Sequence, residues 1–132
     1  MSATKNPTGA VEVLRRYYDA IDSKRTDEAL ASFAPEATVR AGNQPARPWM
    51  EGLEAMAREL RGVAATRHEI TRVIEGPDGE AACELDIAYL LETGEEITLS
   101  GAAFCEIREG RFHRQHLYVD LAPVRDALGR ER

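Results

Sequence analysis

Two acidic side chains, Glu84 and Asp86, stand two residues apart in a predicted strand and are the first candidates for chemistry. Residues two apart in a strand lie on the same face of the sheet, so the two carboxylates would be neighbours. If that face borders an apolar pocket, desolvation raises their pKa values, and like-charge repulsion raises one of them further. Such a carboxylate is suited to abstracting a proton beside a carbonyl group or to activating water.

The same strand supports a second interpretation, in which Glu84 and Asp86 are ordinary surface residues. A plain amphipathic strand would bury its apolar face in the core and leave the two acids in water. The two interpretations differ by one residue of register, and a β-bulge can convert one into the other. The opposing apolar row consists of Cys83, Leu85, Ile87, Tyr89 and Leu91.

Histidine and cysteine supply few further candidates. His113 and His116 fall on opposite faces of the last predicted strand, and we include His113 among the catalytic candidates. The histidines have no recognisable metal-ligand spacing, so we expect no metal site. Cys105 has no nearby base and is interpreted as a small apolar filler. The sequence has no glycine-rich phosphate loop, and we therefore expect no cofactor.

The composition describes one globular domain of 132 residues with 43% apolar and 30% charged residues. A net charge of −6 disfavours nucleic acid or an anionic membrane as the main partner. The sequence lacks a long apolar run and a secretory signal, so we expect a cytoplasmic protein with reduced cysteines. We assign residues 1–8 to a flexible N-terminus, 9–129 to the domain and 130–132 to a tail.

The order of predicted elements indicates an α+β fold whose helices cover one face of an antiparallel sheet. The stripe Val11, Leu14, Tyr18 and Ile21 marks the first helix, and the turns at Thr93-Gly94 and Glu109-Gly110 separate predicted hairpin strands. The predicted helices cover about 8–23, 26–33 and 49–61, with a closing turn at 123–128, and the predicted strands cover 37–40, 67–75, 80–92, 95–107 and 111–120.

Three stretches, 13–39, 50–56 and 107–129, carry a resemblance to a known superfamily. They contain the sequences VLRRYYDAIDSKRTDEALASFAPEATV, MEGLEAM and IREGRFHRQHLYVDLAPVRDALG. The chain resembles the SnoaL-like, or nuclear-transport-factor-two-like, superfamily, which has the ketosteroid-isomerase-like fold. The resemblance implies a curved antiparallel sheet wrapped around three N-terminal helices, forming a cone with a central pocket.

The catalytic sets of this superfamily are only partly present. Tyr17 matches a tyrosine that helps to bind an oxyanion in the ketosteroid isomerases, whereas Ala41 and Ala103 occupy the places of their base and acid. Asp86 matches one of three positions of the limonene-epoxide-hydrolase-like set. The resemblance therefore implies Asp86 as base or acid, Tyr17 as its polar partner, and Glu84 beside them.

The resemblance also implies the direction of the side chains. It points Glu84 and Asp86 into the cone and the Leu85, Ile87 and Tyr89 row to the back of the sheet, where many members dimerise. The candidate pocket lining is Tyr18, Phe33, Trp49, Met56, Leu60, Ala88, Leu90, Ala103, Cys105, Gln115 and Leu117.

Two functions follow as alternatives. The first is a cofactor-independent enzyme that acts on a small, largely apolar metabolite by acid–base chemistry, as an isomerase, cyclase, dehydratase or epoxide hydrolase. The second is a non-catalytic small-molecule-binding module or dimeric interaction module of the same fold. Under both we expect a homodimer formed through the back of the sheet.

Overall fold

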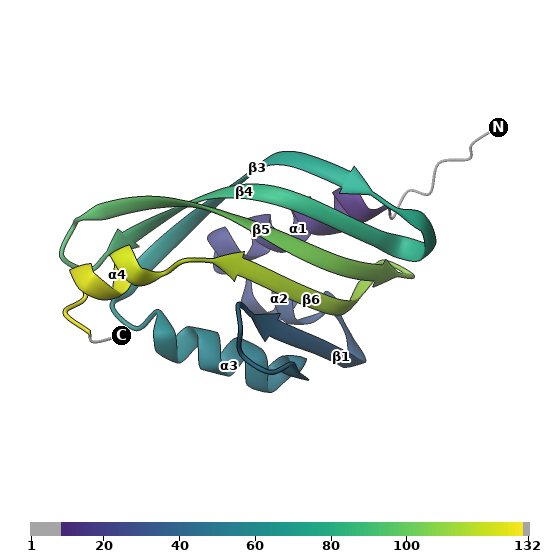
Figure 1. Ribbon diagram of the computed structural model, residues 1–132, viewed down its shortest axis with the longest axis horizontal. Coiled ribbons are helices and arrows are strands. Elements are labelled where there is room, and N and C mark those ends of the chain that lie inside the picture. Colours follow the sequence, from purple (N-terminus) through teal and green to yellow (C-terminus); the bar gives the residue numbers. More distant parts are fainter. Residues whose placement is uncertain (1–8, 131–132) are drawn as a thin grey trace.

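A six-stranded curved sheet lies over the helices, and the fold is α+β as predicted (Figure 1). The computed structural model describes residues 9–130. The expected flexible N-terminus and residues 131–132 of the expected tail lie outside the described residues. The elements are α1 (Ala10–Asp22), α2 (Thr26–Leu30), β1 (Phe33–Ala41), β2 (Arg47–Pro48), α3 (Trp49–Glu59), β3 (Val63–Glu75), η1 (Pro77–Gly79), β4 (Glu80–Leu91), β5 (Glu96–Arg108), β6 (Arg111–Val119) and α4 (Ala122–Ala127).

The sheet is mixed, with the strand order β2-β1-β6-β5-β4-β3. Strands β3 to β6 pair antiparallel through successive hairpins, as the turn residues predict. The expectation of a wholly antiparallel sheet is wrong at one place, because β1 pairs with β6 in parallel. These two strands are joined by no hairpin, so their pairing is a long-range contact that turn residues do not specify.

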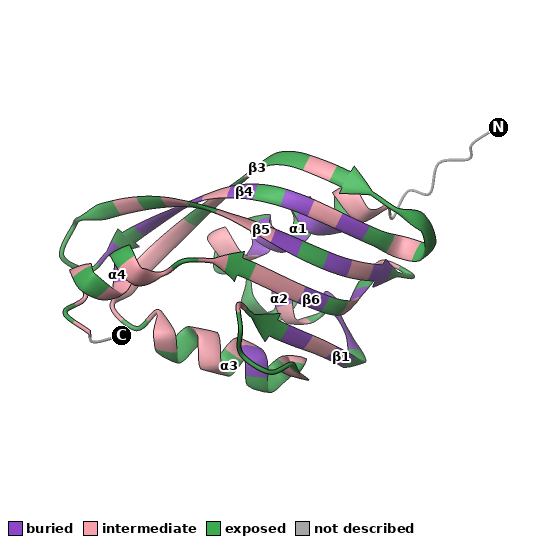
Figure 2. Cartoon of the chain, in the orientation of Figure 1, coloured by how far each residue is buried: buried purple, intermediate pink, exposed green. Residues whose placement is uncertain are grey.

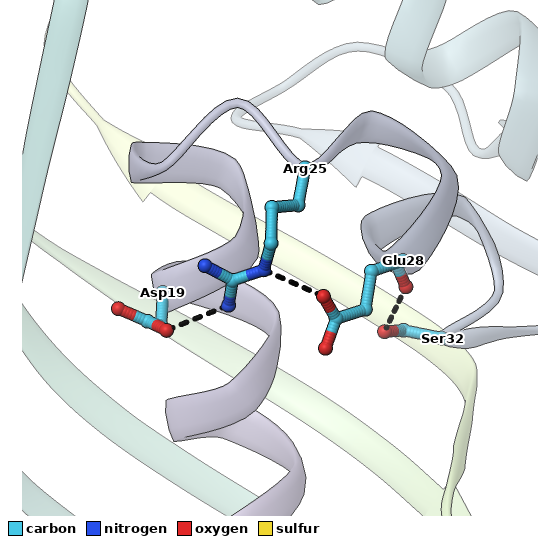
Figure 3. Close-up of polar contacts among 4 residues, drawn as sticks. All are labelled: Asp19, Arg25, Glu28 and Ser32. Atoms are coloured by element: carbon cyan, nitrogen blue, oxygen red, sulfur yellow. Dashed lines mark hydrogen bonds and ion pairs between the residues drawn. The ribbon is translucent and has the colours of Figure 1, made fainter.

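Helix α1 packs its apolar stripe against the sheet, where Leu14 and Tyr18 are buried. Arg25 then braces the corner between α1 and α2 by donating hydrogen bonds to Asp19 over 2.7 Å and to Glu28 over 2.6 Å (Figure 3). Helix α2 ends at Leu30, so the prediction that it continues to residue 33 is wrong. Phe33 instead begins β1 and pairs with Phe112.

The inner face of β4 decides between the two interpretations of the acidic pair (Figure 2). Leu85, Ile87 and Tyr89 are buried in the core, whereas Glu84 is exposed and Asp86 is half-buried. The plain amphipathic interpretation is confirmed, and the orientation implied by the resemblance is wrong. The physical reason is the continuous register between β4 and β5, since only a bulge would exchange the two faces.

No helix within the described range 9–130 is long and apolar enough to cross a lipid bilayer.

Candidate functional site

A cavity of about 770 Å³ opens between α3, the segment joining β1 to β2, the end of β6, and α4. Its apolar wall is made by Val39, Met56, Leu60, Leu117, Val119 and Leu121, together with the Tyr89 ring. The cavity lies at the last residues of β1 and β6, because Val39, Leu117 and Val119 belong to its lining.

The face of α3 that lines the cavity is set by residues four apart, Gly52, Met56 and Leu60. Gly52 permits a close approach of α3 to β1, since a Cβ there would stand 2.9 Å from the Cβ of Val39. Because residue 52 has no side chain, α3 can pack closely against β1. The following residues on the same side, Met56 and Leu60, then line the cavity.

Tyr89 is the aromatic group of the cavity wall and is only 3% exposed. Burial raises the pKa of Tyr89 to about 12, so the phenol stays protonated at neutral pH. Its hydroxyl forms no hydrogen bond to any of residues 9–130. A neutral phenol in an apolar wall is a hydrogen-bond donor that a ligand oxygen can use.

The mouth of the cavity is charged, and among residues 9–130 its only acidic side chain is Glu59. Arg125 on α4 donates to one Glu59 carboxylate oxygen from Nε over 3.2 Å and from Nη2 over 2.5 Å. These hydrogen bonds lower the pKa of Glu59 below its usual value, which keeps the carboxylate ionised. Arg130 donates to the main-chain carbonyls of Glu59 and Arg61. These hydrogen bonds from Arg125 and Arg130 hold the segment after β6 against the end of α3.

Three of the predicted lining residues, Met56, Leu60 and Leu117, lie at this cavity. Tyr89 was missed because the resemblance directs its row to the back of the sheet. The alternation of apolar residues from Cys83 to Leu91 was the sequence pattern that indicates a buried Tyr89 side chain.

The other predicted lining residues lie elsewhere. Trp49 stacks on Phe33 with ring centroids 5.0 Å apart, which fills the space beside β1 with aromatic packing. Leu90 is exposed at the end of β4. Those buried outside the cavity wall are Tyr18, Phe33, Ala88, Ala103, Cys105 and Gln115.

Tyr17, the predicted oxyanion donor, lies in the closed core. Its ring packs edge-on against Phe33 and Phe112, at centroid distances of 5.5 Å and 5.1 Å. Burial raises the pKa of Tyr17, and the nearby Gln115 amide opposes that effect. Tyr17 is not among the residues that line this cavity, because its ring is held in the aromatic cluster.

The predicted acid–base residues also lie away from the cavity. Asp86 is on the outer face, where it accepts a hydrogen bond of 2.9 Å from Ser100, and Glu84 is exposed beside it. His113 is the extra residue of a bulge in β6, and its Nδ1 is 3.8 Å from the exposed carboxylate of Glu36. We expected His113 to point inward on the same face as Gln115 and Leu117. The bulge makes this expectation wrong, because it interrupts the alternation of inward and outward side chains between His113 and those two residues.

A second polar cluster joins the end of α1 to β3. The Asp22 carboxylate accepts hydrogen bonds from the main-chain nitrogen of His68 over 2.6 Å and from Thr66 over 3.0 Å. It also lies 2.7 Å from His68 Nδ1, and the imidazole stacks on Tyr18. None of these residues is among those that line the cavity. Their hydrogen bonds join the end of α1 to β3.

The cysteines are not reactive groups. Burial raises the pKa of Cys83 to about 11 and that of Cys105 to about 12, so both remain thiols. In the described part of the chain, no group of three or more His, Cys, Asp or Glu side chains is arranged to hold a metal.

The model of the SnoaL-like domain family matches residues 14–115. No curated protein sequence matches the chain significantly. Among solved structures, one described as a "putative SnoaL-like polyketide cyclase" from Jannaschia sp. CCS1 has a TM-score of 0.75 at 12% identity, covering 99% of this chain and 100% of that one.

Two further solved structures share the fold. A "putative polyketide cyclase" from Xanthomonas campestris pv. campestris has a TM-score of 0.70 at 19% identity, covering 87% of this chain and 93% of that one. TerC, co-crystallised with polyporic acid, has a TM-score of 0.75 at 14% identity, covering 94% and 99%. At these identities the likeness establishes the fold and leaves the chemistry to the residues of the cavity.

Proposed function

Because the chain belongs to the SnoaL-like domain family, we propose that it binds a small, largely apolar metabolite in the α3–α4 cavity and converts it by cofactor-independent acid–base chemistry of the isomerase or cyclase type. The observation that carries this proposal is the unpartnered Tyr89 hydroxyl in the wall of an otherwise apolar cavity. A volume of about 770 Å³ is within the usual range for small-molecule sites.

Two groups at the cavity replace the acid–base residues expected from the sequence. The Tyr89 phenol donates a hydrogen bond to a substrate carbonyl and stabilises the negative charge that develops on its oxygen. Because its pKa is lowered by Arg125, Glu59 is ionised but weakly basic, so the proton that it accepts must come from an acidic carbon such as one between two carbonyls. The neighbours described as polyketide cyclases, and the TerC crystal with polyporic acid, support a substrate of this general kind.

The test is turnover of a panel of 1,3-diketones and unsaturated ketones, followed by loss of enol absorbance and by mass spectrometry of the products. Tyr89→Phe is expected to lower kcat about 100-fold with unchanged thermal unfolding. Tyr118→Phe, on the outer face of β6, is the matched control and should retain full activity. Equal activity of Tyr89→Phe and wild type on every substrate that turns over would contradict the role of Tyr89.

Binding without turnover is the second candidate function. It is favoured by one observation, the outward direction of Glu84 and Asp86, which leaves Glu59 as the one carboxylate that the residues 9–130 bring to the cavity. The two functions are separated by incubating the protein with each panel compound and analysing the bound fraction. An unchanged ligand, bound by wild type and lost in a cavity-filling variant, would favour the binding module.

We also propose that the protein is a homodimer formed through the outer face of the sheet. We expected Leu85, Ile87 and Tyr89 on this face, but these residues belong to the core. Other apolar side chains occupy the outer face. Ile74, Phe104 and Tyr118 are 54%, 53% and 43% exposed on the outer face. The flanking charges have both signs, as a self-complementary surface requires, and they include Arg72, Glu84, Glu106 and Arg114.

A further inference from the structure

The mouth of the cavity is basic, although the chain as a whole carries a net charge of −6. Two of the basic side chains there are already used within the protein, Arg125 by the Glu59 carboxylate and Arg130 by main-chain carbonyls. In the described part of the chain, the cavity is lined by one acidic residue, Glu59, and by five arginines, Arg47, Arg58, Arg61, Arg125 and Arg130.

Three cavity arginines, Arg47, Arg58 and Arg61, make no side-chain hydrogen bond or ion pair with the residues that the structure describes. Arg58 is in the last turn of α3, Arg61 follows the helix by two residues, and Arg47 belongs to β2. A guanidinium remains charged at any physiological pH and binds a planar carboxylate with two parallel hydrogen bonds. Arg47 is half-buried, and Arg58 and Arg61 are exposed at the mouth of the cavity.

The part of the cavity lining that β4 and β6 supply has a different character. Leu117 and Val119 are apolar, and Tyr89 contributes a ring with a single polar tip. A ligand that satisfies both regions must have an apolar body and an anionic end. A neutral apolar molecule would fill the wall and leave the three arginines unused.

Resting on the proposed function, we infer that the ligand of this site is an amphipathic organic acid, with its apolar body against Leu117 and Tyr89 and its carboxylate bound by Arg58 and Arg61 at the mouth. The carboxylate sets the orientation of the molecule, because only one end can reach the arginines. The other end of the molecule then lies at the Tyr89 hydroxyl.

The test compares two probes of equal shape, naphthalene-2-carboxylate and naphthalene-2-carboxamide, by isothermal titration calorimetry with the full-length protein. The wild type should bind the carboxylate at least about tenfold more tightly than the amide. The variant Arg58→Gln/Arg61→Gln should lose about tenfold in affinity for the carboxylate and keep its affinity for the amide. Arg15→Gln/Arg16→Gln on α1 is the control with the same change in net charge, and it should bind both probes like wild type.

Two results would overturn the inference while leaving the proposed function in place. One is equal affinity of the wild type for the two probes. The other is equal loss of carboxylate affinity in both double variants, which would mark a long-range charge effect. In either case Ala55→Phe, which fills the cavity from α3, should still abolish binding of both probes. Binding of neither probe to the wild type would instead overturn the proposed function and the inference together.

Discussion

Arg125 on α4 holds the Glu59 carboxylate at the end of α3, with hydrogen bonds from Nε and Nη2 to the same oxygen atom. The two residues are 66 positions apart in the chain, yet their contact closes one side of the cavity. Helix α4 has only the six residues Ala122–Ala127 and would be marginal on its own, so this pair and the buried Val124 fix its position.

The Glu59–Arg125 pair predicts an acid-dependent loss of stability. Because the folded pKa of Glu59 lies below its ordinary value of 4.5, the stabilisation is complete above pH 4.5. It is lost as the pH falls through the lower folded pKa. Urea unfolding should show a wild-type advantage over Glu59→Gln of up to about 1 kcal/mol at pH 7, because the pair is partly exposed. An advantage of the same size at pH 3 would contradict this account, and Glu54→Gln is the exposed control on the same helix.

Gly52→Ala should destabilise the protein although alanine is the better helix former. The added Cβ would lie 2.9 Å from the Cβ of Val39, so α3 must move away from β1. The gain in helix propensity, about 1 kcal/mol, is expected to be outweighed, for a net loss of about 1 kcal/mol. Thermal unfolding measures the loss. A rise in Tm relative to wild type would show that the contact between the added Cβ and Val39 does not destabilise the protein.

The β4 strand shows what the sequence could predict and what it could not. The alternation of Leu85, Ile87 and Tyr89 with Glu84 and Asp86 specifies the buried face by elementary hydrophobic patterning. The family resemblance favoured the opposite direction, and it failed because the β4–β5 register is continuous. In β4, the alternation of apolar and polar residues predicted the buried face better than the family resemblance did.

Features that depend on distant parts of the chain were less predictable. The parallel pairing of β1 with β6 and the bulge at His113 leave no local pattern in the sequence. A pocket was predicted from the fold, and Met56 and Leu60, two of the residues named for its lining, lie at the cavity. Its basic mouth was not foreseen, because it assembles from β2, α3 and the segment around α4, whose proximity appears only after folding.

Asp22→Ala should cost about 2–3 kcal/mol of stability, since the carboxylate satisfies both the main-chain nitrogen of His68 and the Thr66 hydroxyl. Asp19→Ala, in the same helix, removes only an exposed ion pair with Arg25 and should cost less than about 1 kcal/mol. Urea unfolding of the two variants checks the difference. Equal losses in the free energy of unfolding would mean that the Asp22 hydrogen bonds stabilise the fold no more than an exposed ion pair does.

Phe104→Glu should convert the proposed dimer into a monomer at micromolar concentration, because it puts a charge into the exposed apolar patch of the outer face. Met50→Glu changes an equally exposed apolar residue on α3 and should leave the dimer intact. Light scattering coupled to gel filtration gives the masses. A wild-type protein of 14.6 kDa by this measurement would refute the dimer.

The most direct test of the central claim is the position of a bound ligand. Nuclear Overhauser effects should be measured between naphthalene-2-carboxylate and the isotope-labelled protein at saturating ligand. We expect effects from the naphthalene protons to the Tyr89 ring and to the methyl groups of Leu117. Effects confined to Phe104 and Tyr118 on the outer face would contradict it, since the ligand would then lie outside the cavity.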